Sequence, residues 1–379
     1  MKTDRVSLGL YVHIPFCVKK CAYCDFYSQT DYSVSDAYLQ ALLTEAKILS
    51  QQHQGRLVDT VYIGGGTPSS LTAAQLNDLL GALREVFAIA TDAEFTLESN
   101  PATLDEEKLS VLKNRGVNRL SIGLQSASNQ ELCTLSRVHS YEDFEKTYHL
   151  ARRYIDNISL DLMFGLPDQT EASFQKTLER AVAFQPNHIS MYALKIEEGT
   201  PFHRIEETLS LPSEDEVANM YLNACDFLEK AGFLQYEISN FARQGCLSQH
   251  NLRYWKREEY IGLGPAAHSY VNGRRYANAK DLRAYIHALS KGKLPPVSEE
   301  VSLSHQEELE EEIMLRLRIT DGLDLEYLEK VLGYAMEKTV ASKIQEYVKH
   351  GFLTQRGNVI AMTPRGFLVS NTIISDLLP

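Results

Sequence analysis

Hydrophobic and polar positions follow a repeating pattern of two kinds of segment in the first half of the chain. Short apolar, β-branched runs have the length of buried strands, and the longer stretches between them have the apolar period of amphipathic helices. Repetition of the two predicts parallel β/α units. The predicted strands are 8–14, 58–63, 94–98, 119–124, 159–163 and 188–194, and the predicted helices include 36–51, 73–86, 141–154 and 171–184.

Six such units indicate an α/β fold in which the strands close part of a barrel, an incomplete version of the (β/α)8 design. Ligands of such barrels bind at the C-terminal ends of the strands. We therefore expect the chemistry of this chain to lie in the loops that directly follow the predicted strands.

A different pattern begins near residue 303. Helical stretches at 306–317, 325–331 and 340–350 precede two short apolar runs that are separated by Gly357 and Asn358, a hairpin signal. Helices followed by a hairpin predict a winged-helix-like domain. The predicted division of the chain is a barrel domain at 1–275, a linker at 276–302 and the winged-helix-like domain at 303–379.

Composition narrows the partners and the compartment. The chain has 379 residues and a formal net charge of −12, so we expect no nucleic-acid partner, and the acidic run 307–312 is expected to be a solvated helix face. No apolar run approaches about 20 residues, so no integral membrane segment is expected. Six cysteines without a signal peptide argue against a disulfide framework and for the cytoplasm. A homodimer is compatible with the sequence.

Three cysteines directly after the first predicted strand carry the strongest chemical signal. Cys17, Cys21 and Cys24 form the spacing C-x3-C-x2-C. Thiolates are the usual ligands of iron–sulfur clusters, and four irons normally take four of them, so three would leave one iron open to a substrate or cofactor. A structural zinc site would need a fourth ligand, for which His13 is nearest, and a redox pair would use only the last two cysteines.

The cysteine motif, with Tyr23 before its last cysteine, resembles the signature of the radical S-adenosylmethionine (SAM) enzymes. Further motifs follow in the order of one branch of that family, which contains the oxygen-independent coproporphyrinogen III oxidases and the HemW-type heme chaperones. The resemblance covers almost the whole chain and implies a radical SAM partial (β/α)6 barrel with a [4Fe–4S] cluster and SAM. The motifs are 64–68, 98–101, 121–125, 135–139 and 161–167.

Two features separate the relatives within this branch. The oxidases carry a further cysteine two residues after the third, where this chain has Phe26, and an N-terminal extension, where this chain has 16 residues before Cys17. Residues 250–255, in contrast, resemble the H-N-x-x-Y-W motif associated with heme binding in the HemW group. The resemblance therefore favours the HemW-type chaperones, and the barrel domain would include this heme-binding-motif segment.

The resemblance also assigns roles to individual residues, none of them catalytic. The three cysteines would bind the cluster, Arg137 would pair with the SAM carboxylate, and Asp161 would accept from the ribose hydroxyls. The alternative for these two is a buried ion pair within the barrel. The full set implied for SAM is Tyr11, Tyr23, Gly65, Gly66, Thr67, Glu98, Gln125, Arg137 and Asp161.

Heme contact is implied for His250, Asn251, Tyr254 and Trp255. Imidazole is a standard axial ligand of heme iron, and the aromatic rings could cover a porphyrin face. The alternative is a loop packed against the barrel, with His250 hydrogen-bonded in the core.

The function that the resemblance implies is a chaperone that carries heme and delivers it to acceptor proteins such as respiratory enzymes, with a regulatory or structural role for SAM. The alternative is the oxidative decarboxylation of coproporphyrinogen III to protoporphyrinogen IX. A zinc-dependent winged-helix regulator would leave every barrel motif unused.

Overall fold

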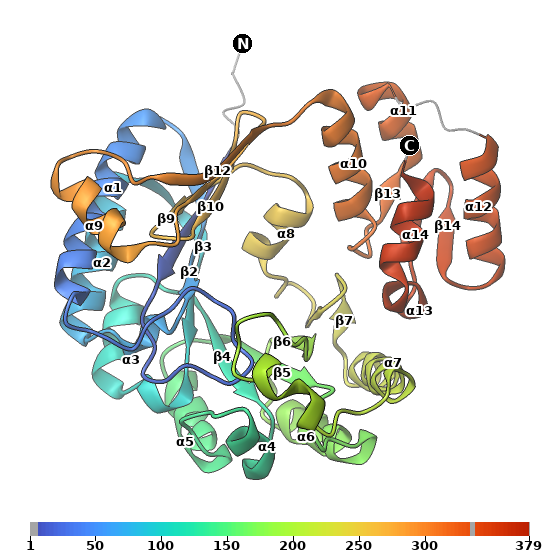
Figure 1. Ribbon diagram of the computed structural model, residues 1–379, viewed down its shortest axis with the longest axis horizontal. Coiled ribbons are helices and arrows are strands. Elements are labelled where there is room, and N and C mark those ends of the chain that lie inside the picture. Colours follow the sequence, from blue (N-terminus) through green and yellow to red (C-terminus); the bar gives the residue numbers. More distant parts are fainter. Residues whose placement is uncertain (1–6, 334–337, 379) are drawn as a thin grey trace.

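The computed structural model describes residues 7–333 and 338–378. Within these residues the strands form one sheet of twelve strands and a second sheet of three (Figure 1). The larger sheet contains the barrel, and the smaller one belongs to the C-terminal domain. The six barrel strands thus lie in the larger sheet, and the strands of residues 323–362 form the smaller one.

Six parallel strands pair in chain order and form the partial barrel, which confirms the predicted α/β fold. The third strand begins six residues earlier than predicted. Its first residues are the apolar Ala88, Ile89 and Ala90, which come soon after the predicted helix 73–86, and they pair with the second strand up to a register irregularity near Val58. The six strands are β1 (Leu8–Ile14), β2 (Leu57–Gly65), β3 (Ala88–Ser99), β4 (Arg119–Gln125), β5 (Asn157–Phe164) and β6 (His188–Ala193).

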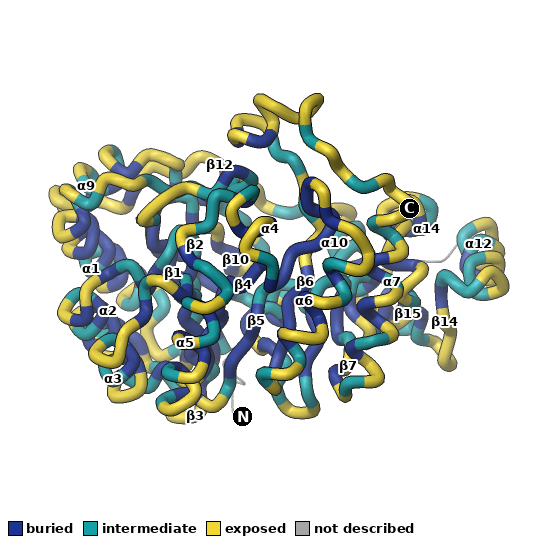
Figure 2. Tube along the Cα trace, turned by 90° about the horizontal axis from the view of Figure 1, so that it is seen from below, coloured by how far each residue is buried: buried dark blue, intermediate teal, exposed yellow. Residues whose placement is uncertain are grey.

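The helices that follow these strands cover the outer side of the sheet (Figure 1), and residues on their outward faces are exposed (Figure 2). Capping boxes at Thr72, Ser140 and Thr170 satisfy free backbone N–H groups and fix where α2, α5 and α6 begin. These helices are α1 (Ser35–Gln52), α2 (Ala73–Val86), α3 (Glu106–Asn114), α4 (Asn129–Thr134), α5 (Tyr141–Arg152), α6 (Glu171–Ala183) and α7 (Glu214–Lys230), with short 3₁₀ turns η1 (Pro68–Ser70), η2 (Pro101–Thr103) and η3 (His203–Thr208).

Later segments extend the sheet beyond both ends of the barrel. The stretch 276–302, expected as a linker, instead contains the end of one strand, a helix and a further strand whose residues are all exposed and mostly polar. Because that strand has no buried face, it carries no apolar pattern. The added elements are β7 (Leu234–Gln235), β8 (Asn240–Ala242), α8 (Gln249–Trp255), β9 (Tyr260–Leu263), β10 (His268–Val271), β11 (Arg274–Asn278), α9 (Leu282–Ser290) and β12 (Val297–Ser302).

The C-terminal domain consists of helices around a small antiparallel sheet, with the predicted hairpin turning at Gly357, whose φ is +61°. This arrangement agrees with the winged-helix-like prediction. Its elements are α10 (His305–Arg316), β13 (Leu323–Asp324), α11 (Leu325–Leu332), α12 (Lys338–Lys349), β14 (Leu353–Arg356), β15 (Val359–Met362), α13 (Pro364–Leu368) and α14 (Ser370–Leu377).

The sequence suggested that the acidic run on α10 is a solvated helix face, but the structure shows that it is partly buried. Glu312 is buried and pairs with Arg257 and with Arg316. Glu311 accepts two hydrogen bonds from Arg275 of β11, at 2.6 and 2.7 Å. A two-pronged contact of this kind is among the stronger ion pairs, so these carboxylates fasten the C-terminal domain to the extended sheet.

Candidate functional site

A cavity of about 350 Å³ lies within the partial barrel and opens beside the cysteine loop. Side chains on a strand alternate between its two faces, so every second residue of a barrel strand points inward. On β4 these are Arg119, Ser121, Gly123 and Gln125, and all four line the cavity. The predicted motifs therefore meet at one place, as barrel geometry requires.

Cys17, Cys21 and Cys24 are free and line the mouth of this cavity together. The Thr67 hydroxyl donates to Cys17 Sγ at 3.4 Å, and Arg137 Nη1 donates to Cys21 Sγ at 3.5 Å. Burial raises the pKa of the Cys24 thiol to about 11. Three thiols around one opening fit an iron–sulfur cluster with one open iron.

The residues at the cavity mouth also bear on two alternatives, a structural zinc site and a coproporphyrinogen III oxidase. Among residues 7–333 and 338–378, no three His, Cys, Asp or Glu side chains converge closely enough to hold a single metal ion. Phe26 lines the cavity and is 60% exposed. The position at which the oxidases carry an additional cysteine therefore presents an apolar ring to the cavity and not a ligand.

The glycine loop after β2 packs against the strand end that leads into the cysteines. Gly66 N donates to Ile14 O at 2.8 Å, and a Cβ at position 66 would lie 2.6 Å from Phe16 O. Gly65 has a φ of +105° and donates its N–H to Glu98. Gly66 and Thr67 line the cavity, whereas Gly65 does not. Close backbone approach therefore explains this part of the motif.

Two partly buried carboxylates, Glu98 of β3 and Asp161 of β5, line the cavity. Glu98 accepts from the Tyr62 hydroxyl at 2.7 Å and from Gly65 N at 3.1 Å, and burial raises its pKa to about 7. Asp161 accepts from the Ser121 hydroxyl at 2.9 and 3.1 Å, and burial raises its pKa as well. Both groups can accept hydrogen bonds from the hydroxyl or amino groups of a ligand.

Arg137 does not form the ion pair with Asp161 that the sequence left open. Its Nη2 donates to Gly123 O at 2.9 Å and its Nη1 to Cys21, while its buried Nε has no hydrogen-bond partner. Gln125 and Tyr23 line the cavity beside it, and burial raises the pKa of Tyr23. The guanidinium thus lies between the cysteine loop and the cavity, where it could meet a carboxylate.

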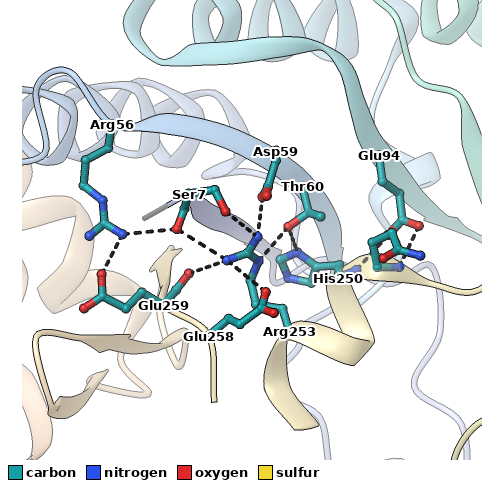
Figure 3. A network of polar contacts seen from close by, with 10 residues as sticks. Ser7, Arg56, Asp59, Thr60, Glu94, His250, Arg253, Glu258 and Glu259 are labelled. Carbon is teal, nitrogen blue, oxygen red and sulfur yellow. Dashed lines mark hydrogen bonds and ion pairs between the residues drawn. The ribbon is translucent and has the colours of Figure 1, made fainter. Parts of the chain in front are cut away.

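Figure 3 shows the surroundings of the α8 motif. His250 is completely buried, with Nδ1 hydrogen-bonded to the Thr60 hydroxyl at 2.9 Å and Nε2 to the Tyr254 hydroxyl at 2.8 Å. Burial lowers its pKa to about 3. Next to it, the buried Arg253 donates to Thr60 and pairs with Asp59. The motif therefore joins α8 to the barrel strand β2.

This geometry corresponds to the alternative in which His250 is a hydrogen-bonded core residue. Of the four residues implied for heme, only Asn251 lines the cavity, whereas His250, Tyr254 and Trp255 do not. Heme ligation by His250 stays a prediction, and it would require the ring nitrogen that binds the iron to lose its hydrogen bond, while the other nitrogen could keep its own.

Tyr11 also lies outside the cavity lining, and its hydroxyl bonds to His13 Nδ1 at 3.0 Å. Conversely, the cavity is also lined by Tyr62 and Arg119, which lie outside the predicted motifs, and by Ser121, which lies in a predicted motif but was assigned no role. Each lies an even number of residues from a predicted site residue or motif glycine on the same strand. The two-residue period of a strand was the signal that could have found them.

Comparison with known proteins agrees with this arrangement. The Radical SAM superfamily profile matches residues 11–181, and that of the HemN C-terminal domain matches 303–369. The heme chaperone HemW of Bacillus subtilis is 36% identical over 97% of this chain and 98% of its own length. That of Escherichia coli is 34% identical over 98% of each. The coproporphyrinogen III oxidase HemN from Escherichia coli superposes with a TM-score of 0.84 at 25% identity, over 99% of this chain and 90% of its own.

The partial barrel, the three-cysteine loop and the cavity are those of a radical SAM protein. Within that superfamily the chain belongs to the HemW family. In the described residues, none of the helices combines the length and the apolar character that a membrane span requires.

Proposed function

We propose that this chain is a cytoplasmic heme chaperone that binds a [4Fe–4S] cluster, SAM and heme, and delivers heme to acceptor proteins such as respiratory enzymes. The names of its relatives support this proposal, because several proteins that align with nearly the whole chain are called heme chaperones. The observation in the molecule itself that carries it is Phe26, which occupies the rim of the cavity where the oxidases have a cysteine.

Cys17, Cys21 and Cys24 would hold the cluster, and the open iron would face the cavity. Glu98 and Asp161 would accept hydrogen bonds from SAM, and Gln125, Gly66 and Thr67 would line its binding site. Arg137 would meet a carboxylate near the thiols, because its Nη1 is directed at Cys21 and its Nε is unused. When bound together, a reduced cluster and SAM can supply one-electron chemistry, and in a chaperone their role would be regulatory or structural.

Heme would bind at the cavity mouth or at the α8 motif, and different substitutions should weaken heme binding in the two cases. Phe26 offers an exposed aromatic face at the mouth, suited to packing on a porphyrin. His250 would offer an axial ligand only after one of its ring nitrogens is released, Nδ1 from Thr60 or Nε2 from Tyr254. Phe26→Ser should weaken heme binding in the first case, and His250→Ala in the second. Assembly as a homodimer remains part of the proposal.

The second candidate is an oxygen-independent coproporphyrinogen III oxidase. The observation in its favour is the superposition with the Escherichia coli oxidase over 99% of this chain. The fold alone does not decide between the two, because related folds host different functions.

An anaerobic assay separates the candidates. The protein with a reconstituted cluster is incubated with SAM, a reductant and coproporphyrinogen III, and products are separated by chromatography. We expect no protoporphyrinogen, together with stoichiometric heme binding and transfer of that heme to an apo-acceptor. Phe26→Cys serves as the matched variant, since it restores the additional cysteine. Catalytic product from the wild-type protein would contradict the chaperone proposal.

A further inference from the structure

Arg119, at the start of β4, is the largest fully buried side chain among the described residues, with 1% of its surface exposed. It nevertheless lines the cavity, together with Ser121 and Gly123 of the same strand. A guanidinium is always charged in a protein, so this residue places a permanent positive charge inside the barrel.

The charge has no direct partner in the part of the chain that the structure describes. Arg119 Nε is buried without a hydrogen-bond acceptor. The positive charge of Arg119 acts to lower the pKa of Glu98 and of Asp161. Neither carboxylate is hydrogen-bonded to it: Glu98 accepts from Tyr62 and Gly65, and Asp161 accepts from Ser121. Burying a charge without a hydrogen-bonded partner is costly, so the fold retains this arginine at a price in stability.

Arg119 also lies deeper in the barrel than the groups near the cysteines. Gly123 accepts from Arg137, which in turn reaches Cys21. Four residues of strand separate Gly123 from Arg119, which corresponds to about 13 Å along β4. The two arginines therefore mark two levels of one cavity, one at the thiols and one toward its floor.

We propose that Arg119 is a ligand-binding residue that pairs with a carboxylate of the molecule in the cavity. A carboxylate matches the guanidinium in charge and planar geometry and could accept from the unused Nε. This inference rests on the proposed function, which supplies two carboxylate-bearing ligands: SAM, through its amino-acid group, and heme, through its propionates. Their shared chemistry is what the site recognises.

The experiment measures the affinity of the protein with its cluster for four ligands by calorimetry. These are SAM, decarboxylated SAM, heme and heme dimethyl ester, so that each carboxylate ligand has a partner without the carboxylate. Arg119→Met is compared with the wild type and with Arg153→Met, whose arginine is exposed on the outer surface. Arg119→Lys keeps the buried charge without the two-pronged geometry, and it serves if the methionine variant does not fold.

We expect Arg119→Met to weaken the binding of one carboxylate ligand by about 10- to 100-fold and to leave its carboxylate-free partner unchanged. The cluster absorbance should stay intact. A loss confined to heme identifies a propionate, and a loss confined to SAM identifies its amino-acid carboxylate. Arg119→Lys should show a smaller loss for the same ligand.

Equal affinities in the arginine variants and the wild type, or an equal loss for both members of a ligand pair, would overturn the inference and leave the proposed function intact. A wild-type protein that binds neither SAM nor heme would overturn the proposed function and this inference with it.

Discussion

The buried imidazole of His250 allows the role of the α8 motif to be tested by stability as well as by heme binding. Its two hydrogen bonds, to Thr60 and Tyr254, tie α8 to the barrel. His250→Asn retains an amide that can replace one of them, and His250→Ala removes both. Each lost buried hydrogen bond costs about 1 kcal/mol, and an unsatisfied partner adds about 1–3 kcal/mol. We expect His250→Ala to lose about 2–4 kcal/mol of unfolding free energy at neutral pH.

The pH dependence sharpens this prediction. The pKa of His250 is about 3 in the folded protein and about 6.5 in an unfolded chain, so the unfolded state takes up the proton first as the pH falls. The histidine's contribution to stability is therefore complete above about pH 6.5 and is lost toward pH 3. As the pH falls from about 7 to about 5, this single group should lower the unfolding free energy of the wild type by about 2 kcal/mol. His250→Asn should not show this loss.

Urea unfolding at these two pH values measures both effects, with His287→Asn, at an exposed histidine of α9, as the control. The unfolding free energy of the wild type should exceed that of His250→Asn at neutral pH and should approach it at about pH 5. His250→Ala could instead keep the wild-type unfolding free energy and its pH dependence but lose heme affinity. That result would make the imidazole a heme ligand and would refute its assignment as a hydrogen-bonded core residue.

Three further predictions concern other parts of the molecule. Cys24→Ser should abolish the visible absorbance of the reconstituted cluster, whereas Cys133→Ser, at an exposed cysteine, should keep it. Burial raises the pKa of Glu98 to about 7, so its carboxyl ionises in the unfolded chain at a lower pH than in the folded protein. The unfolding free energy of the wild type should therefore fall by about 2 kcal/mol as the pH rises from about 5.5 to about 7.5. Glu98→Gln should remove that loss in urea unfolding and weaken SAM binding in calorimetry; an unchanged slope would contradict the burial argument. Glu312→Gln should destabilise the protein by about 3 kcal/mol because two arginines lose their buried partner, and an unchanged urea midpoint would show that the contact contributes nothing.

The barrel and the cysteine loop could be predicted because their signals are local. A strand such as β4 alternates apolar residues with polar or small ones over its whole length, and the cysteines follow β1 within a few residues. The contacts of Glu312 and His250 could not be predicted in this way. Each has one partner four positions away, Arg316 or Tyr254, but the partners that join them to other elements, Arg257 and Thr60, lie 55 and 190 positions away and leave no local trace.

The same limit explains the strand β12 and the residue Arg119. No residue of β12 is buried, so the strand is held by backbone pairing with β11 and shows no alternation. Arg119 lies six positions before Gln125, so the strand period places the two on the same face of β4. The burial of Arg119 beside the cavity comes from the surrounding strands and leaves no local trace.

The order in which the chain is synthesised limits when the barrel edge beside the cysteine loop can be completed. Its strand β1 is bordered on one side by β9, and Gly9 N donates to Glu259 O at 3.0 Å. Tyr27, just past the last cysteine of the motif, accepts a hydrogen bond from Leu282 N, 255 positions later. A nascent chain that ends after residue 181, where the superfamily match stops, would leave β1 as an unpaired edge. The edge of the barrel beside the cysteine loop is therefore completed only when residues 259–282 have been synthesised.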